Sequence, residues 1–298
     1  MTLASCDSRK TAGENPFFTE WDTPHGVPPF DKILPEHFMP AFERGMSLHE
    51  AEIDAITSNK DEATFENTIL AYDDAGQMLA QTELVFGMLC APETNDRMQA
   101  LQEQAMPLLA AHRDKIRLDD KLFVRVKEVY DRRAALGLDA EQMRLLQKTY
   151  DSFVRAGALL DAEQKARLKE INGQLSLTAV KFGNNILAEN NNFVLELKSD
   201  ELDGLPAGIR DAAREKAQQM GKGDKWVFTL HKPSLIPLLT YSTRRDLREK
   251  IYKAYLNRCN NGDEYDNKQL INDFIRLRTE KAHLLGYPSY AAYVVADE

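Results

Sequence analysis

The sequence predicts a mainly α-helical protein that holds one short pair of β-strands. Apolar residues recur at spacings of three and four over most of the 298 residues, as they do on the buried face of a helix. Asp or Thr stands directly before many of these runs, where it can cap the first free amides of a helix. Two short segments, 193–197 and 225–230, instead have the β-branched and aromatic content of strands. We therefore expect a multi-helix lobe with one hairpin-like strand pair.

The length and net charge of the chain exclude several classes of protein. A chain of 298 residues buries roughly three quarters of its unfolded surface, so it needs no disulfide or metal for stability. It carries 38 Lys and Arg against 47 Asp and Glu, and this net charge of -9 repels a phosphate backbone. Nucleic acid is therefore not expected as a partner. No apolar stretch reaches the ~20 residues of a membrane span, so the body of the chain is expected to be soluble.

The first thirty residues differ from the rest of the chain. They are rich in Pro, Gly, Thr and Asp, and aromatic residues are interspersed among them, namely Phe17, Phe18, Trp21 and Phe30. This composition predicts an extended arm that packs on a surface rather than a free tail. Residues 31–298 then form the helical lobe.

The first helices of the lobe are predicted from periodicity and caps. Residues 35–58 place Phe38, Phe42, Met46, His49 and Ile53 on one helix face. Four further helices are expected where a capping residue precedes an amphipathic run: Thr94 before 95–117, Asp119 before 120–135, Asp139 before 140–158, and Asp161 before a long helix to about residue 188.

The long helix has the clearest local signals. Asp161 and Gln164 have the spacing of a capping box, in which each side chain satisfies an amide of the other residue. After this start, the helix should carry one apolar stripe, made of Leu168, Ile171, Leu175, Leu177, Val180 and Phe182. A cluster of asparagines should mark the end of the helix, namely Asn184, Asn185, Asn190, Asn191 and Asn192. Any subdivision of the lobe is expected within residues 160–190.

The strand pair should flank a helix at 206–220. Gly221-Lys222-Gly223 lacks the pattern of a phosphate-binding loop and is interpreted as the stop of that helix, with Gly221 in the left-handed conformation. The rest of the chain is again helical in pattern, with helices expected at 234–241, 244–258, 267–284 and from Pro288 to the end.

One stretch nearly matches a zinc-peptidase signature. Such a site needs two histidines four residues apart on a helix, with a glutamate between them. The chain has His49-Glu50-Ala51-Glu52-Ile53, and isoleucine cannot bind zinc. The other histidines have no second His or Cys three or four residues away; they are His25, His37, His112, His231 and His283. We therefore assign no catalytic residue and no metal ligand, and interpret each histidine as a hydrogen-bonded or surface residue. A metal site built from carboxylates and scattered histidines stays open as an alternative.

The three cysteines have no metal or redox spacing. Cys90 and Cys259 are interpreted as structural thiols. Cys6 differs because Leu3-Ala4-Ser5-Cys6 resembles the lipobox of bacterial lipoprotein precursors, in which the cysteine is lipidated. That interpretation requires further residues upstream, since Met1 to Ser5 are too short for a secretory signal. It predicts an envelope or periplasmic lipoprotein that meets the membrane only through its anchor. The alternative is a chance match, and then a cytoplasmic protein.

A series of motifs runs in order along residues 15–298, at 28–33, 36–42, 64–69, 122–127, 153–158, 204–206, 276–278 and 284–287. Together they resemble the dipeptidyl carboxypeptidase (peptidyl-dipeptidase) branch of the thimet oligopeptidase family of zinc metallopeptidases. Ala63 departs from the pattern, because the family tends to have proline before Thr64-Phe-Glu-Asn-Thr.

The resemblance implies a helical, two-lobed enzyme with a deep channel. In this branch a zinc site in the C-terminal half cleaves short peptides and releases C-terminal dipeptides. Residues 31–298 would be the N-terminal lobe that forms one wall of the channel, with the zinc and the catalytic C-terminal lobe beyond the chain. By itself the chain is then expected to be inactive and to bind no cofactor, with short peptides and the missing lobe as its partners. The alternative is a non-catalytic helical scaffold or peptide-binding protein.

Overall fold

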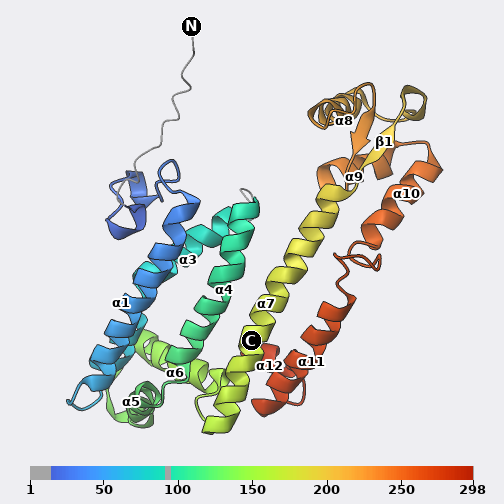
Figure 1. The fold of residues 1–298 in the computed structure, drawn as a ribbon. Helices are drawn as coiled ribbons and strands as arrows, with labels where there is room; N and C mark the ends of the chain where they lie inside the picture. The colour runs from blue at the N-terminus through green and yellow to red at the C-terminus, as the bar shows by residue number, and fades with distance from the viewer. Residues whose placement is uncertain (1–14, 91–94, 298) are drawn as a thin grey trace. The chain divides into compact units, whose positions relative to one another are not determined.

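The computed structural model describes residues 15–90 and 95–297, and it confirms the mainly α-helical class (Figure 1). The chain divides into two compact units. Unit 1 comprises Met1–Leu177 with Arg278–Glu298, and unit 2 comprises Thr178–Leu277. Both boundaries fall inside helices, one in α7 (Ala162–Asn192) and one in α11 (Lys268–Leu284). Among the described residues, none of the helices combines the length and the hydropathy of a membrane span.

Unit 1 is built from helices that pack on two apolar cores. Single 3-10 turns at Pro16–Phe18, Pro24–Gly26 and Pro35–His37 precede the first long helix, and a π-helical turn lies at Phe65–Leu70. The α-helices that lie wholly within unit 1 are α1 (Phe38–Ser58), α2 (Ala71–Asp73), α3 (Gln77–Cys90), α4 (Asp96–Arg117), α5 (Asp120–Asp131), α6 (Ala140–Ala156) and α12 (Tyr290–Val295).

The first core of unit 1 joins the N-terminal arm to α1 and α3. Phe17 is buried with its ring centroid 5.3 Å from that of Phe38, and Phe86 of α3 lies 4.9 Å from Phe38 on another side. The indole N–H of Trp21 donates to the carbonyl of Pro16 at 2.9 Å, which fixes the ring beside Phe17. This part of the arm is thus held on α1 by aromatic packing.

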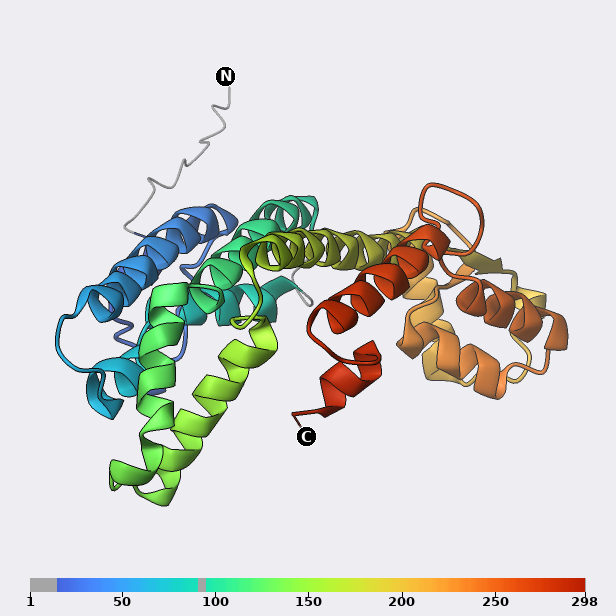
Figure 2. The ribbon, with the colours of Figure 1, turned by 90° about the horizontal axis from the view of Figure 1, so that it is seen from below.

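The second core of unit 1 lies among α5, α6 and the π-helical turn. Phe153 of α6 is fully buried against Phe123 of α5 and Tyr72 of α2. Figures 1 and 2 show α5 and α6 side by side. This apolar contact accounts for the strong helical periodicity of both segments.

Three of the predicted helix caps are confirmed. Asp119 caps α5, and Asp139 and Gln142 form a reciprocal capping box at the start of α6. Asp161 and Gln164 exchange the same two hydrogen bonds at the start of α7, at 2.8 and 3.2 Å. The cap of α4 is Asn95; the predicted cap, Thr94, lies outside the described residues.

The two separate chain segments of unit 1 are joined by polar contacts. Arg155 of α6 donates to the carbonyl of Tyr293 at 2.9 Å, and its guanidinium carbon lies 4.8 Å from the centre of the Tyr293 ring. Arg167 of α7 bonds both carboxylate oxygens of Glu280, at 2.6 and 2.9 Å. The C-terminal segment is therefore an integral part of unit 1.

Unit 2 contains the strand pair and the helices around it. Its elements are β1 (Leu195–Leu197), α8 (Ala207–Gln219), β2 (Trp226–Phe228), α9 (Lys232–Tyr241) and α10 (Arg245–Leu256), with the adjoining parts of α7 and α11. β1 and β2 pair antiparallel, with Leu195 opposite Phe228 and Leu197 opposite Trp226. The predicted strand pair is confirmed. Leu195 and Leu197 point into the core while Glu196 between them is exposed, the alternation of a sheet with one covered face.

Helix α8 ends as the sequence predicts, whereas helix α7 departs from its prediction in its apolar stripe and in its length. Gly221 follows α8 with a φ of +66°, as the interpretation of the Gly-Lys-Gly stretch requires. Along α7, Leu168 and Ile171 of the predicted apolar stripe are buried, and Leu175, Val180 and Phe182 are partly buried, but Leu177 is 50% exposed and departs from the stripe. The helix also continues to Asn192, since its asparagines bond neighbouring segments instead of ending it.

One helix starts later than predicted, one was not predicted, and one prediction concerns a residue outside the described range. The last helix, predicted from Pro288 onward, is α12 and starts after its cap Ser289. Helix α3 was not predicted, because exposed apolar residues such as Leu84 and Met88 obscure its helical period. Cys6 lies outside the described residues, so its lipidation stays a prediction.

Candidate functional site

The near-match to the zinc signature lies on α1, and its side chains serve contacts between helices. Nδ1 of His49 lies 3.0 Å from Nε2 of His112 on α4, so the two rings share a hydrogen bond. Glu50 accepts a bond from Lys115 of α4 at 2.8 Å. Glu52 accepts the backbone N–H of Gly76 at 2.7 Å. Ile53, which replaces the second histidine, is buried in a core.

In these positions the side chains of the near-match pack and bond between helices. A zinc ligand at position 53 would have to leave the apolar core in which Ile53 packs. Within residues 15–90 and 95–297 there is no group of three or more His, Cys, Asp and Glu placed to hold a metal ion. The described residues therefore do not fit a zinc centre, and the alternative of a metal site from scattered residues gains no support from them.

The electrostatics of the histidine pair follow from burial. Desolvation lowers the pKa of His49, and His112 lowers it further, while Glu52 and Glu50 act in the opposite direction. Burial also lowers the pKa of His112, which is 5% exposed. Burial therefore favours the neutral form of both rings.

The other histidines are single residues in different settings. His37 is buried and accepts the N–H of Leu34 on Nδ1 at 3.1 Å, while His25, His231 and His283 are exposed. The fold thus brings His112 to His49 over a separation of 63 residues. Local spacing holds no signal for such a pair, so the sequence interpretation missed it.

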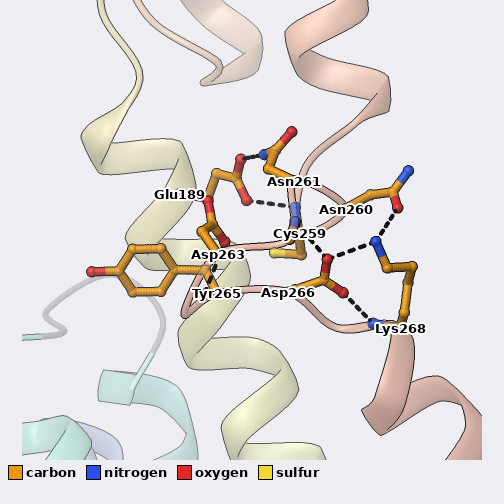
Figure 3. A network of polar contacts seen from close by, with 9 residues as sticks. Glu189, Cys259, Asn260, Asn261, Asp263, Tyr265, Asp266 and Lys268 are labelled. Atoms are coloured by element: carbon orange, nitrogen blue, oxygen red, sulfur yellow. Dashed lines mark hydrogen bonds and ion pairs between the residues drawn. The ribbon is translucent and has the colours of Figure 1, made fainter.

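A second polar cluster organises the loop between α10 and α11 in unit 2 (Figure 3). Glu189 of α7 accepts the backbone N–H of Cys259 at 2.5 Å with one carboxylate oxygen, and the side-chain amide of Asn261 with the other. Asp266 accepts the backbone N–H groups of Gly262 at 2.8 Å and of Lys268 at 2.9 Å. The loop is therefore folded around two carboxylates.

The charge of Asp266 is strongly favoured by its partners. Lys268 bonds this carboxylate through its ammonium group at 2.8 Å, and it lowers the pKa of Asp266 to about 2 together with the backbone N–H donors. The same ammonium group donates to Oδ1 of Asn260 at 3.0 Å. Asn267 closes the loop, because it donates its N–H to the carbonyl of Cys259 at 2.8 Å and accepts from Asn185 of α7.

A cavity of about 430 Å³ adjoins this loop. Its apolar lining comes from three helices and its polar lining from the loop and the first residue of α11; they are Phe182, Ile186, Tyr255, Leu256 and Ile271, and Arg258, Cys259, Asn260, Asn267 and Lys268. Arg258 and Asn267 already bond α7, Lys268 bonds Asn260, and the cavity has the size of a small ligand pocket. Its chemistry suits apolar contact rather than catalysis.

The thiol in this cavity is not an activated nucleophile. Burial raises the pKa of Cys259 to about 11, and Glu189 adds to the shift. A thiolate is needed for nucleophilic attack, so this environment works against covalent catalysis. Cys90 in unit 1 has its pKa raised to about 11 by burial as well. Both residues fit the interpretation as structural thiols.

The rate at which the Cys259 thiol is alkylated reports whether the thiol is buried and protonated. In a C6S/C90S background, native Cys259 should react with iodoacetamide at pH 8 about tenfold more slowly than in the urea-unfolded chain, because little thiolate forms. Glu189→Ala removes the acceptor of the Cys259 amide and should speed the reaction, whereas Glu215→Ala on α8, away from the loop, should not. Equal rates in native and unfolded protein would contradict the buried, protonated thiol.

A more apolar cavity of about 600 Å³ lies in unit 1. It is formed by the segment before α1, the end of α3 and the start of α4, and its walls are Phe30, Ile33, Leu34, Pro35, Phe38, Met88, Leu89, Asn95 and Met98. Asn95 is the one polar residue among these described lining residues, so they offer a mainly apolar surface.

Comparison with known proteins finds sequence similarity to one group of peptidases. Residues 238–298 match the model of peptidase family M3. Over 285 residues the chain is 36% identical to the dipeptidyl carboxypeptidase of Escherichia coli (strain K12) and 34% identical to that of Salmonella typhimurium. It is 27% identical over 281 residues to the oligopeptidase A of Escherichia coli (strain K12).

The matches cover most of this chain but less than half of each relative. They include 95%, 95% and 90% of this chain, but 42%, 42% and 40% of the three relatives, so the chain spans about two fifths of their length. The similarities support assignment of the chain to the thimet oligopeptidase family. Within that family they support the dipeptidyl carboxypeptidase branch, which has the higher identities.

Proposed function

We propose that this chain is the N-terminal, channel-forming lobe of a zinc metallopeptidase that releases C-terminal dipeptides from short peptides. The observation that carries the proposal is the match of 95% of the chain to 42% of a dipeptidyl carboxypeptidase. We further propose that the chain alone is inactive. In support, the part of the chain that the structure describes holds no set of three zinc ligands, and its one near-motif is used for helix packing.

In this proposal the zinc and the catalytic glutamate belong to a part of the protein beyond these residues. The lobe contributes by restricting substrate length and by excluding water from the closed channel. Apolar surface is available for such contacts in both units, at the two cavities described above.

The test compares two proteins on the same substrate. The 298-residue chain and the complete product of its gene are incubated with a blocked tetrapeptide, each with zinc and each with a chelator. Chelator-sensitive release of the C-terminal dipeptide by the complete product alone supports the proposal. Zinc-dependent hydrolysis by the 298-residue chain contradicts its inactivity. No hydrolysis by either protein, or a gene that ends at residue 298, favours the non-catalytic scaffold or peptide-binding protein instead.

A further inference from the structure

The contact between His49 and His112 joins two long helices of unit 1. The ring centroids lie 5.0 Å apart at an interplanar angle of 61°, and the facing nitrogens are 3.0 Å apart. A hydrogen bond at this distance requires that one facing nitrogen carries a proton and the other presents a lone pair. The contact between α1 and α4 therefore depends on the protonation state of the pair.

The surroundings restrict how the rings can respond. A side-chain carbon built on Gly76 would lie 2.9 Å from Nδ1 of His49, so the backbone closes one side of that ring. His112 is almost fully buried, and its other nitrogen, Nδ1, lies 3.5 Å from Oε1 of Glu50 without forming a hydrogen bond. His112 therefore has little access to water, whereas the His49 ring is partly exposed and has Gly76 against one side.

Charged groups near the pair come from three helices. Glu50 and Glu52 lie on α1, Lys115 on α4 and Glu83 on α3. The carboxylate of Glu50 is already paired with Lys115, and that of Glu52 bonds the amide of Gly76. The carboxylates stabilise a first added proton, since imidazolium can still donate to the neutral ring. A second proton places two N–H groups against each other, and each ring then carries a buried positive charge.

We propose that His49 and His112 form an acid-sensitive contact between α1 and α4, which holds while the pair carries at most one extra proton and separates when both rings are charged. The inference concerns a property of unit 1 and is independent of the proposed peptidase function.

The sign of the effect follows from proton uptake. The unfolded chain binds protons on these rings near pH 6.5, whereas the folded pair resists them, with both pKa values lowered. The contribution of the pair to stability is therefore complete above pH 6.5 and is lost as the pH falls through the lowered values. For each proton that only the unfolded state binds, the unfolding equilibrium constant rises about tenfold per pH unit.

Urea unfolding of the 298-residue chain tests the proposal. The chain has two tryptophans, Trp21 in unit 1 and Trp226 in unit 2, so a Trp226→Phe background makes fluorescence report on unit 1. His112→Gln and His49→Asn keep an amide near each facing nitrogen but do not titrate. Between pH 7.5 and 5.5 the equilibrium constant for unfolding should rise more in the parent than in either variant, by up to about tenfold for each additional proton that only the unfolded parent binds.

Two further measurements complete the test. The control His231→Gln changes an exposed histidine of unit 2 and should keep the pH dependence of the parent. Histidine ring signals in carbon-labelled parent protein report the titration without a substitution, and two of the six rings should titrate below pH 6.5 as a coupled pair. Equal pH dependence in parent and variants, or six rings that all titrate near pH 6.5, would overturn the proposal.

Discussion

Replacement of Gly204 by alanine should destabilise unit 2 by about 3 kcal/mol or more. Gly204 has a φ of +82°, a conformation that strains any residue with a side chain. Its added carbon would also lie 2.3 Å from the carbonyl oxygen of Tyr241 and 3.0 Å from the backbone nitrogen of Thr243. Both obstacles are backbone atoms, and Thr243 is held in place by its N–H bond to Asp203 at 3.1 Å, so the clash cannot be relieved by a side-chain rotation.

Two matched glycines separate the causes of this effect. Gly223→Ala has a similar φ of +61° but no atom within 4 Å of the new carbon, so it should cost about 1 kcal/mol from backbone strain alone. Gly208→Ala lies in α8 with open space around it and should be neutral or slightly stabilising. Urea unfolding followed by Trp226 fluorescence in a Trp21→Phe background measures all three. A loss at Gly204 no larger than that at Gly223 would refute the role of the clash.

Arg125→Met should destabilise unit 1 by about 3 kcal/mol. Arg125 of α5 is 9% exposed, and its guanidinium donates to the carbonyls of Asn59 and Asp61 at 3.0 and 3.1 Å and to Oδ1 of Asn67 at 3.1 Å. Methionine fills similar volume but removes all three charge-assisted bonds. Oδ1 of Asn67 keeps the bonds from Thr64 and Thr68, so the loss falls mainly on the contacts to segment 59–61.

The control for this substitution lies on the same helix. Lys121→Met changes an exposed residue of α5 and should stay within about 0.5 kcal/mol of the parent. Arg125→Lys retains the charge but not the planar fork, so it should fall between the two. Trp21 fluorescence in the Trp226→Phe background reports the transition. If Arg125→Met unfolds like the parent, the segment 59–67 is held by other contacts.

Features that depend on neighbouring residues were predictable from the sequence. The capping box of Asp161 and Gln164 needs only residues three apart, and the strand composition of β1 needs only its own segment. The end of α7 was predicted about four residues early, because Asn185 and Asn190 bond Asn267 and Arg258, which follow much later in the chain. Local propensity cannot anticipate such long-range partners.

The candidate site shows the same limit. Spacing was enough to recognise that Ile53 interrupts the zinc signature, and the structure adds that this position packs in a core. Sequence spacing could not indicate that His49 contacts His112 or that Glu189 bonds the backbone of Cys259, because these contacts span 63 and 70 residues. Pairing across such distances is set by how the helices pack and not by any local pattern.

The division of α7 and α11 between two units has a consequence for the order of folding during synthesis. Unit 2 is one uninterrupted stretch of chain, whereas unit 1 needs Arg278–Glu298 in addition to its first segment. The bonds from Arg155 to Tyr293 and from Arg167 to Glu280 cannot form until that last segment has left the ribosome. Synthesis therefore delivers every residue of unit 2 before it delivers the residues that complete unit 1, so the part of the protein that starts first is finished last.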